Sequence, residues 1–165
     1  MDSKSIYSGL LLSVAIMAFV IPAGMAEDAI GMTGTAKNVI LLIGDGMGFP
    51  QLTLARIEKA GESLSQYGPL DLFMDGMDAT GYVSTSSANS FVTDSAPAAT
   101  AIATGNKTNN GVIGQDATAV QGKMDGKNLT SILEMAEEAG LSTGLVTTTR
   151  ITHATPAAFY AHVNN

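Results

Sequence analysis

A continuous run of apolar residues, Val39–Ile43, ends abruptly at a glycine-rich turn, Gly44–Gly48. Unbroken apolarity is typical of a central parallel strand that is covered on both faces, because a strand with one wet face alternates apolar and polar side chains. The next segment, residues 50–60, has a helical pattern. A buried strand, a tight turn and a helix form the repeating unit of α/β proteins, so this stretch constrains the fold class.

The rest of the chain continues this alternation. The further elements that we expect are strands at 81–85 and 141–149 and helices at 95–104, 129–139 and 156–163. Asn128 can cap the helix at 129–139 and Gly140 can end it, while 106–127 is predicted to be a long polar loop. The order predicts an α/β fold with a mostly parallel sheet sandwiched by helices. With only three or four strands predicted, we expect the sheet to be incomplete within these 165 residues.

The first 26 residues have the pattern of a signal peptide. Lys4 gives a weakly positive start, Leu10–Ile21 is apolar, and Gly24 and Ala26 form a small-x-small cleavage site. A retained membrane anchor is the alternative, but the apolar run is shorter than the about 20 residues that span a bilayer. We therefore expect export to a periplasmic, extracellular or cell-surface location.

The predicted organisation is then a signal peptide at 1–26, a linker at 27–37 and the N-terminal part of a larger α/β domain at 38–165. Composition narrows its chemistry: 45% of the residues are hydrophobic and 14% charged, which excludes intrinsic disorder. The net charge of −7 argues against nucleic-acid binding and leaves an uncleaved signal segment as the expected route to a membrane. Because the chain has no cysteine, a metal site must use Asp, Glu, His, Ser or Thr.

Asp45 lies inside the glycine-rich turn, at the carboxyl end of the first predicted strand, where open α/β sheets bind ligands. A carboxylate between glycines would repel a pyrophosphate, so a cation is the better candidate ligand. The alternative is an aspartate that only stabilises its own turn.

Ser95 begins an alanine-rich helical segment that is preceded by Asp94. Free N–H groups at a helix N-terminus favour an anion and would help Ser95 act as a nucleophile beside a phosphate. No G-x-S-x-G motif is present, so activation by a metal is expected instead of activation by a histidine base. The alternative is an ordinary helix cap.

His153 and Thr155 follow the strand predicted at 141–149 and could face an ion or its water shell. The alternative is that Thr155 caps a helix with Pro156 at its first position. His162 is interpreted as a surface or packing residue.

Together and in this order, the motifs at Gly44–Gly48, Thr93–Ala96 and His153–Ala157 resemble the N-terminal part of alkaline phosphatases. The resemblance spans residues 38–163, and the segment that runs from Ser95 to Gly105 is its most specific part. It implies hydrolysis of phosphate monoesters through a phosphoserine, two zinc ions and one magnesium ion, and a possible homodimer at full length.

The same resemblance implies roles for individual residues. Asp45 matches a carboxylate that bridges zinc and magnesium, and Ser95 matches the nucleophile, which is also a zinc ligand. Asp94 matches an acidic residue that helps to orient the phosphate-binding arginine. Thr155 matches a magnesium ligand, and His153 occupies a position near magnesium that is Asp in some members.

Other parts of the family pattern are not matched. The family's remaining zinc ligands and its phosphate-binding arginine lie downstream of the positions matched here, and Arg150 precedes the motif and does not match that arginine. We therefore expect the 165-residue polypeptide to be inactive alone. A sulfatase-like or phosphotransferase member of the superfamily, or a secreted non-catalytic binding protein with a degenerate site, are the alternatives.

Overall fold

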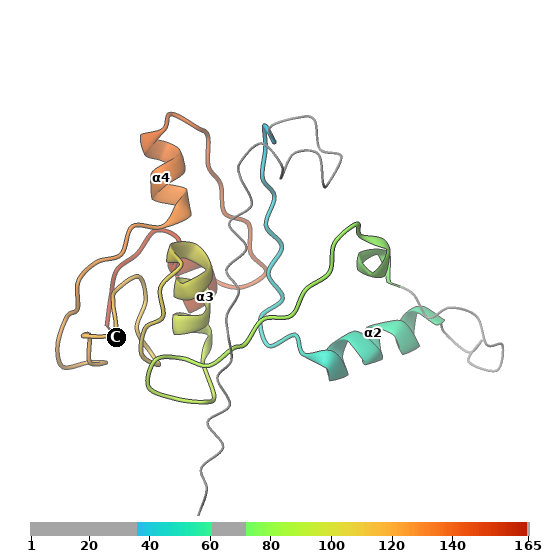
Figure 1. Ribbon diagram of the computed structural model, residues 1–165, viewed down its shortest axis with the longest axis horizontal. Helices are drawn as coiled ribbons and strands as arrows, with labels where there is room; N and C mark the ends of the chain where they lie inside the picture. The colour runs from blue at the N-terminus through green and yellow to red at the C-terminus, as the bar shows by residue number, and fades with distance from the viewer. Residues whose placement is uncertain (1–35, 61–71, 165) are drawn as a thin grey trace, which may run out of the picture. The chain divides into compact units, whose positions relative to one another are not determined.

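The computed structural model describes residues 36–60 and 72–164 (Figure 1). The predicted signal peptide, and all but the end of the predicted linker, lie outside the described residues. The chain divides into two units, 1–42 and 43–165. The described helices all belong to the second unit: α2 (Phe49–Ala60), the 3₁₀ helix η2 (Phe73–Gly76), α3 (Ser95–Thr104), α4 (Ile132–Glu138) and α5 (Ala154–Ala157).

Helix α3 is the best-specified element, and its predicted bounds are confirmed. Asp94 caps it, because its carboxylate accepts a hydrogen bond from the backbone N–H of Ala96 at 2.8 Å. Alanines, the best helix formers, fill much of its interior, and Gly105 in a left-handed conformation ends it.

Helix α3 packs against both α4 and α5 (Figure 1). The buried core between α3 and α5 consists of small side chains and one larger one: Ala96, Ala99, Ile113, Ala157 and Ala158. Alanine faces let two helices approach closely, because little side-chain volume separates the backbones. This close packing holds the first residues of α3 and α5 in fixed relative positions.

The predicted loop at 106–127 is ordered by its own hydrogen bonds. Thr108 is buried and its hydroxyl donates to the Asp116 carbonyl at 3.1 Å. Val112 is fully buried, and Ile113 forms an antiparallel bridge with Val163. A loop that satisfies its backbone in this way can act as a wall of a site.

Two predicted helices have different bounds. Helix α4 begins after Ser131, not at Leu129, because the Ser131 hydroxyl and the Glu134 carboxylate form a reciprocal capping box. Asn128, the predicted cap, instead accepts a hydrogen bond from Gln115 at 3.2 Å.

The helix predicted at 156–163 is the short α5, Ala154–Ala157, with His153 as its N-cap. The chain turns after α5, and Val163 then pairs with Ile113 in both directions at 2.8 Å. This non-local pairing competes with continuation of the helix.

The predicted strands are not paired into a sheet in the part of the chain that the structure describes. The β pairing in these residues consists of three isolated bridges and no continuous ladder, and none of the bridges involves 39–43, 81–85 or 141–149. Large apolar side chains in these segments are exposed, for example Val83 (85%) and Val146 (102%). The three strand predictions are therefore not met in the described residues, because a strand exists only when a neighbour satisfies its N–H and C=O groups.

We expect the 165-residue chain to self-associate as its concentration rises, because exposed apolar segments with unpaired backbone groups template contacts between chains. Light scattering and hydrophobic-dye binding would measure this. Val146→Lys should reduce both signals, since it places a charge on a fully exposed apolar position. A sharply melting monomer at every concentration would contradict the expectation.

Helix α2 is linked to η2 by an ion pair. The Arg56 guanidinium donates two hydrogen bonds to the carboxylate of Asp75. The Leu72 N–H also donates to this carboxylate, at 2.7 Å. The Arg56 hydrogen bond and then the Leu72 hydrogen bond lower the pKa of Asp75 below its ordinary value. Arg56 therefore already has a carboxylate partner.

Among the described helices, none is long and apolar enough to cross a bilayer.

His162 links the long loop to α4. Its Nδ1 lies 2.7 Å from the Gly114 carbonyl, and its Nε2 lies 3.0 Å from the Glu134 carboxylate. Burial lowers the pKa of His162, but the hydrogen bonds to Gly114 and Glu134 outweigh it, so its pKa lies above the ordinary 6.5. The Ser131 N–H, and then His162 itself, lower the pKa of Glu134 below 4.5.

These shifts predict a pH window. Because the pKa of His162 is raised, its contribution to folding stability is fully present below pH 6.5 and is lost as the pH rises through the folded-state pKa. Because the pKa of Glu134 is lowered, its contribution is fully present above pH 4.5 and is lost as the pH falls through the folded-state pKa. We expect the His162 imidazole to titrate above 6.5 by NMR in dilute solution, and Glu134→Gln to lower that midpoint. An unchanged midpoint in Glu134→Gln would show that the pair does not set the pKa.

Candidate functional site

Asp45 is held in a tight turn. The Met47 N–H donates to the Gly44 carbonyl at 3.3 Å, and the Gly48 N–H donates to the Gly46 carbonyl at 3.1 Å. Gly46 has φ +64°, a conformation that side-chain-bearing residues rarely adopt. The turn leaves the Asp45 carboxylate exposed and free to accept hydrogen bonds from distant parts of the chain.

Two hydroxyl groups converge on this carboxylate. The Ser95 hydroxyl lies 2.8 Å from Oδ1 and 3.0 Å from Oδ2 of Asp45. The Thr155 hydroxyl donates to Oδ2 at 3.0 Å. Ser95 is 50 residues from Asp45 and Thr155 is 110, so only the tertiary fold brings the three together.

This geometry bears on the alternatives left open by the sequence. The cap of α3 is Asp94, so the Ser95 hydroxyl is not used as a cap. The N-cap of α5 is His153, and the Thr155 hydroxyl points to Asp45 instead of capping the helix. Asp45 in turn accepts hydrogen bonds from two other segments of the chain, a role beyond that of a turn stabiliser.

Asp94 connects α3 to the long loop. One carboxylate oxygen accepts from the Ala96 N–H and the other from the Gly111 N–H, each at 2.8 Å. Gly111 has φ +77°, which suits glycine. Both oxygens are thus engaged by backbone donors, and within the described chain Asp94 forms no ion pair with an arginine.

His153 carries a buried nitrogen without a partner. Its Nδ1 is shielded from solvent and makes no hydrogen bond among the described residues. Because a buried polar atom is costly unless it is satisfied, such an atom points to a water or a ligand. This observation supports His153 as a residue that faces a ligand.

An open depression of about 390 Å³ lies beside Ser95. It is lined by two groups of residues, one from the start of α3 and the long loop and one from the segment before α5: Asp94, Ser95, Ala96, Gly111 and Ile113, then Arg150, Thr152, His153 and Ala154. Sequence reasoning missed Arg150, Gly111 and Ile113. Proximity to His153 along the chain was the available signal for Arg150, whereas only the fold reveals the other two.

The donor set fits a hard cation. One carboxylate, with two hydroxyl oxygens that each lie within 3.0 Å of it, offers oxygen ligands of the kind that magnesium accepts. The described residues contain no group of three or more His, Asp or Glu side chains arranged to hold a metal. Asp45, Ser95 and Thr155 thus form a partial oxygen-donor site, with His153 on the wall of the adjoining depression.

Comparison with known proteins identifies the family of this chain. The profile of the alkaline phosphatase family matches residues 36–165. The chain belongs to the alkaline phosphatase family. Alkaline phosphatase 4 of Drosophila melanogaster is 45% identical over 129 residues, which cover 78% of this chain and 22% of the fly protein.

Solved alkaline phosphatases share part of the fold. The cold-active enzyme of a psychrophilic Shewanella matches with a TM-score of 0.62 and 35% identity, over 74% of this chain and 29% of the enzyme. A His-to-Asp variant of the TAB5 enzyme, with Mg bound in its M3 site, matches with a TM-score of 0.54 and 36% identity, over 68% of this chain and 29% of the other. The partial match agrees with the predicted fold class.

The chain spans about a quarter of the length of these relatives.

Proposed function

We propose that this chain contributes the nucleophile and part of the metal site for phosphate monoester hydrolysis. The convergence of the Ser95 and Thr155 hydroxyls on the Asp45 carboxylate, within 3.0 Å, carries the proposal. Ser95 also stands at the start of the ten-residue α3. Unpaired N–H groups and the helix dipole at that end favour the negative charge of a phosphate.

The Asp45 carboxylate accepts a hydrogen bond from the Ser95 hydroxyl at 2.8 Å and so holds this oxygen beside the depression that Ser95 lines. In the proposed reaction the Ser95 oxygen attacks phosphorus, an O–P bond to Ser95 forms and the ester P–O bond breaks. The O–H bond of Ser95 breaks in this step, and its proton is taken up by the leaving alkoxide, which departs as the alcohol. Water then attacks the phosphoserine, releases phosphate and returns a proton to Ser95. Positioning accounts for much of the catalysis of phosphoryl transfer.

Two zinc ions and one magnesium ion are the proposed cofactors. When bound, such ions lower the pKa of a coordinated hydroxyl and neutralise charge on the transferring group. Asp45, Ser95 and Thr155 would supply oxygen ligands, and His153 would face the magnesium or its water shell. Magnesium in the M3 site of the TAB5 variant supports this assignment by analogy.

The test is turnover of p-nitrophenyl phosphate with zinc and magnesium present. A chimera in which this chain replaces the matching segment of the fly relative should hydrolyse the ester, because the rest of that protein can supply further ligands. The 165-residue chain alone should not, since zinc sites normally have four ligands. A chimera that folds and retains metal but has no turnover would favour a non-catalytic binding protein.

A further inference from the structure

One wall of the depression belongs to a short segment of the long loop, Gly111–Gly114, which we call the wall segment. Helix α3 and its cap hold two amides of this segment. The Gly111 N–H donates to the Asp94 carboxylate at 2.8 Å, and the Gly114 N–H donates to the Thr100 hydroxyl at 3.0 Å. Because Asp94 caps α3 and Thr100 is fully buried, these bonds fix one side of the wall segment to the helix.

The residues that follow α5 hold the other side of the wall segment. Val163 pairs with Ile113, and each backbone N–H donates to the other residue's carbonyl at 2.8 Å. The neighbouring His162 places its Nδ1 2.7 Å from the Gly114 carbonyl. A Cβ on Gly114 would overlap the His162 ring and the Ala161 carbonyl, so this close approach needs glycine.

His162 lies between two groups that can only accept hydrogen bonds. The Gly114 carbonyl faces Nδ1, and the Glu134 carboxylate of α4 faces Nε2 at 3.0 Å. This carboxylate also accepts from the Ser131 N–H at 2.7 Å, which favours its ionised form. A neutral imidazole has one N–H and can donate to one acceptor, whereas an imidazolium donates to both. Both acceptors are therefore satisfied only when His162 is protonated.

Glu134 is the charged group that acts on this imidazole among the described residues. Helices α3 and α5 contain no charged side chain. The loop presents the Gly114 carbonyl, and its Asp125 carboxylate accepts from the Asn164 amide at 2.7 Å. The protonation of His162 thus depends on one carboxylate, which a single substitution can neutralise.

We propose that His162 is a positioning residue for the site: its imidazolium holds the wall segment beside Ser95, and loss of its proton loosens that wall. Deprotonation leaves one of the two acceptors without a donor, so the contact with Gly114 or the contact with Glu134 must open. Opening either contact removes the link between the wall segment and α4. The consequence for catalysis rests on the proposed function, whereas the change in the wall does not.

Hydrogen exchange followed by mass spectrometry measures this loosening in the dilute 165-residue chain. The measured quantity is the protection of the peptide that contains the wall segment, corrected for the intrinsic exchange rate, from about pH 5 to about pH 9. Protection should fall about ten-fold or more as His162 loses its proton, the scale of one lost hydrogen bond to a charged group. Amides within α3, such as that of Ala103, should keep their protection.

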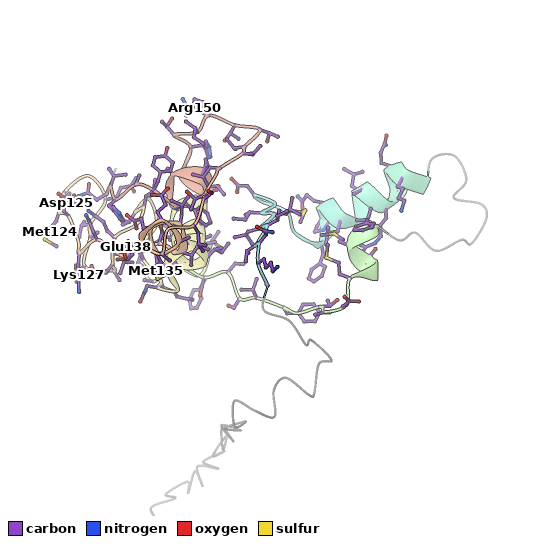
Figure 2. All side chains as sticks on the ribbon, turned by 90° about the horizontal axis from the view of Figure 1, so that it is seen from above. Met124, Asp125, Lys127, Met135, Glu138 and Arg150 are labelled. Atoms are coloured by element: carbon purple, nitrogen blue, oxygen red, sulfur yellow. The ribbon has the colours of Figure 1, made fainter. Side chains whose placement is uncertain are left out.

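Glu134→Gln should move the midpoint of this fall to lower pH. It removes the charge that favours the imidazolium but keeps an oxygen that can accept from it. Glu138→Gln is the matched control, because it makes the same change at the last residue of α4 (Figure 2), and it should leave the midpoint unchanged. His162→Gln should lower the protection of the wall segment and remove the step, since an amide does not titrate. Circular dichroism of all variants verifies that the fold is kept.

Three results would overturn the inference. An equal loss of protection in α3 would show that His162 stabilises the fold as a whole. A midpoint that is the same in Glu134→Gln and in the parent chain would show that another group controls the wall, and so would the absence of any step. Absence of phosphoserine on Ser95 in the chimera would contradict the proposed function alone, because hydrogen exchange does not depend on turnover.

Discussion

Ser95→Ala should abolish the acid-stable phosphoprotein formed when the chimera with the fly relative is quenched during turnover. The variant removes the oxygen that would bond to phosphorus, and Asp45, Thr155 and His153 remain. Turnover should fall by several orders of magnitude, as expected for loss of a nucleophile. The measurement is phosphate retained on denatured protein after an acid quench.

Ser86→Ala provides the matched control, because it makes the same change at a hydroxyl that accepts from Lys107 at 2.6 Å and takes no part in the site. It should keep the phosphoprotein. Persistence of the phosphoprotein in Ser95→Ala would show that another group is the nucleophile.

Asp45→Asn should reduce bound metal as well as rate. The substitution keeps the shape of the side chain but removes the charge on which the Ser95 and Thr155 hydroxyls converge. A cation site that loses a carboxylate loses part of its attraction for the ion, even where other ligands remain. Metal analysis after gel filtration should therefore separate Asp45→Asn, which loses zinc and magnesium, from Ser95→Ala, which largely retains them.

Asp78→Asn is the control for this experiment, since it removes the same charge from an exposed residue in the segment that follows η2. It should retain full metal. If Asp45→Asn also retains full zinc and magnesium, Asp45 is a hydrogen-bond acceptor for Ser95 and Thr155 and not a metal ligand.

Local signals made some elements predictable. The bounds of α3 follow from signals contained in its own sequence, namely the Asp94 cap, the alanines and Gly105. Helix α4 was misplaced because Asn128 and Ser131 are both good caps, and the choice depends on Glu134 and on the pairing of Asn128 with Gln115. Local propensity cannot resolve such competition.

Strand pairing and the assembly of the site depend on contacts between residues far apart in the sequence. The apolar run at 39–43 and the Val- and Thr-containing segment at 141–149 indicate strands, but the described residues contain no partner strands for them. The order of the motifs in the sequence indicated Asp45, Ser95 and Thr155 as site residues. The fold brings them together although Asp45 and Thr155 are 110 residues apart. Gly111 and Ile113 carry no motif, and only the fold shows that they line the depression beside Ser95.

The central claim is that Ser95 is the phosphorylated nucleophile. Peptide mapping by mass spectrometry of the acid-quenched chimera tests it most directly, because it identifies the modified residue. Phosphate on the peptide that contains Thr93–Thr104, localised to Ser95, is the predicted result. Phosphate on Thr100, on Thr155 or on any other residue, with Ser95 unmodified, would contradict the account.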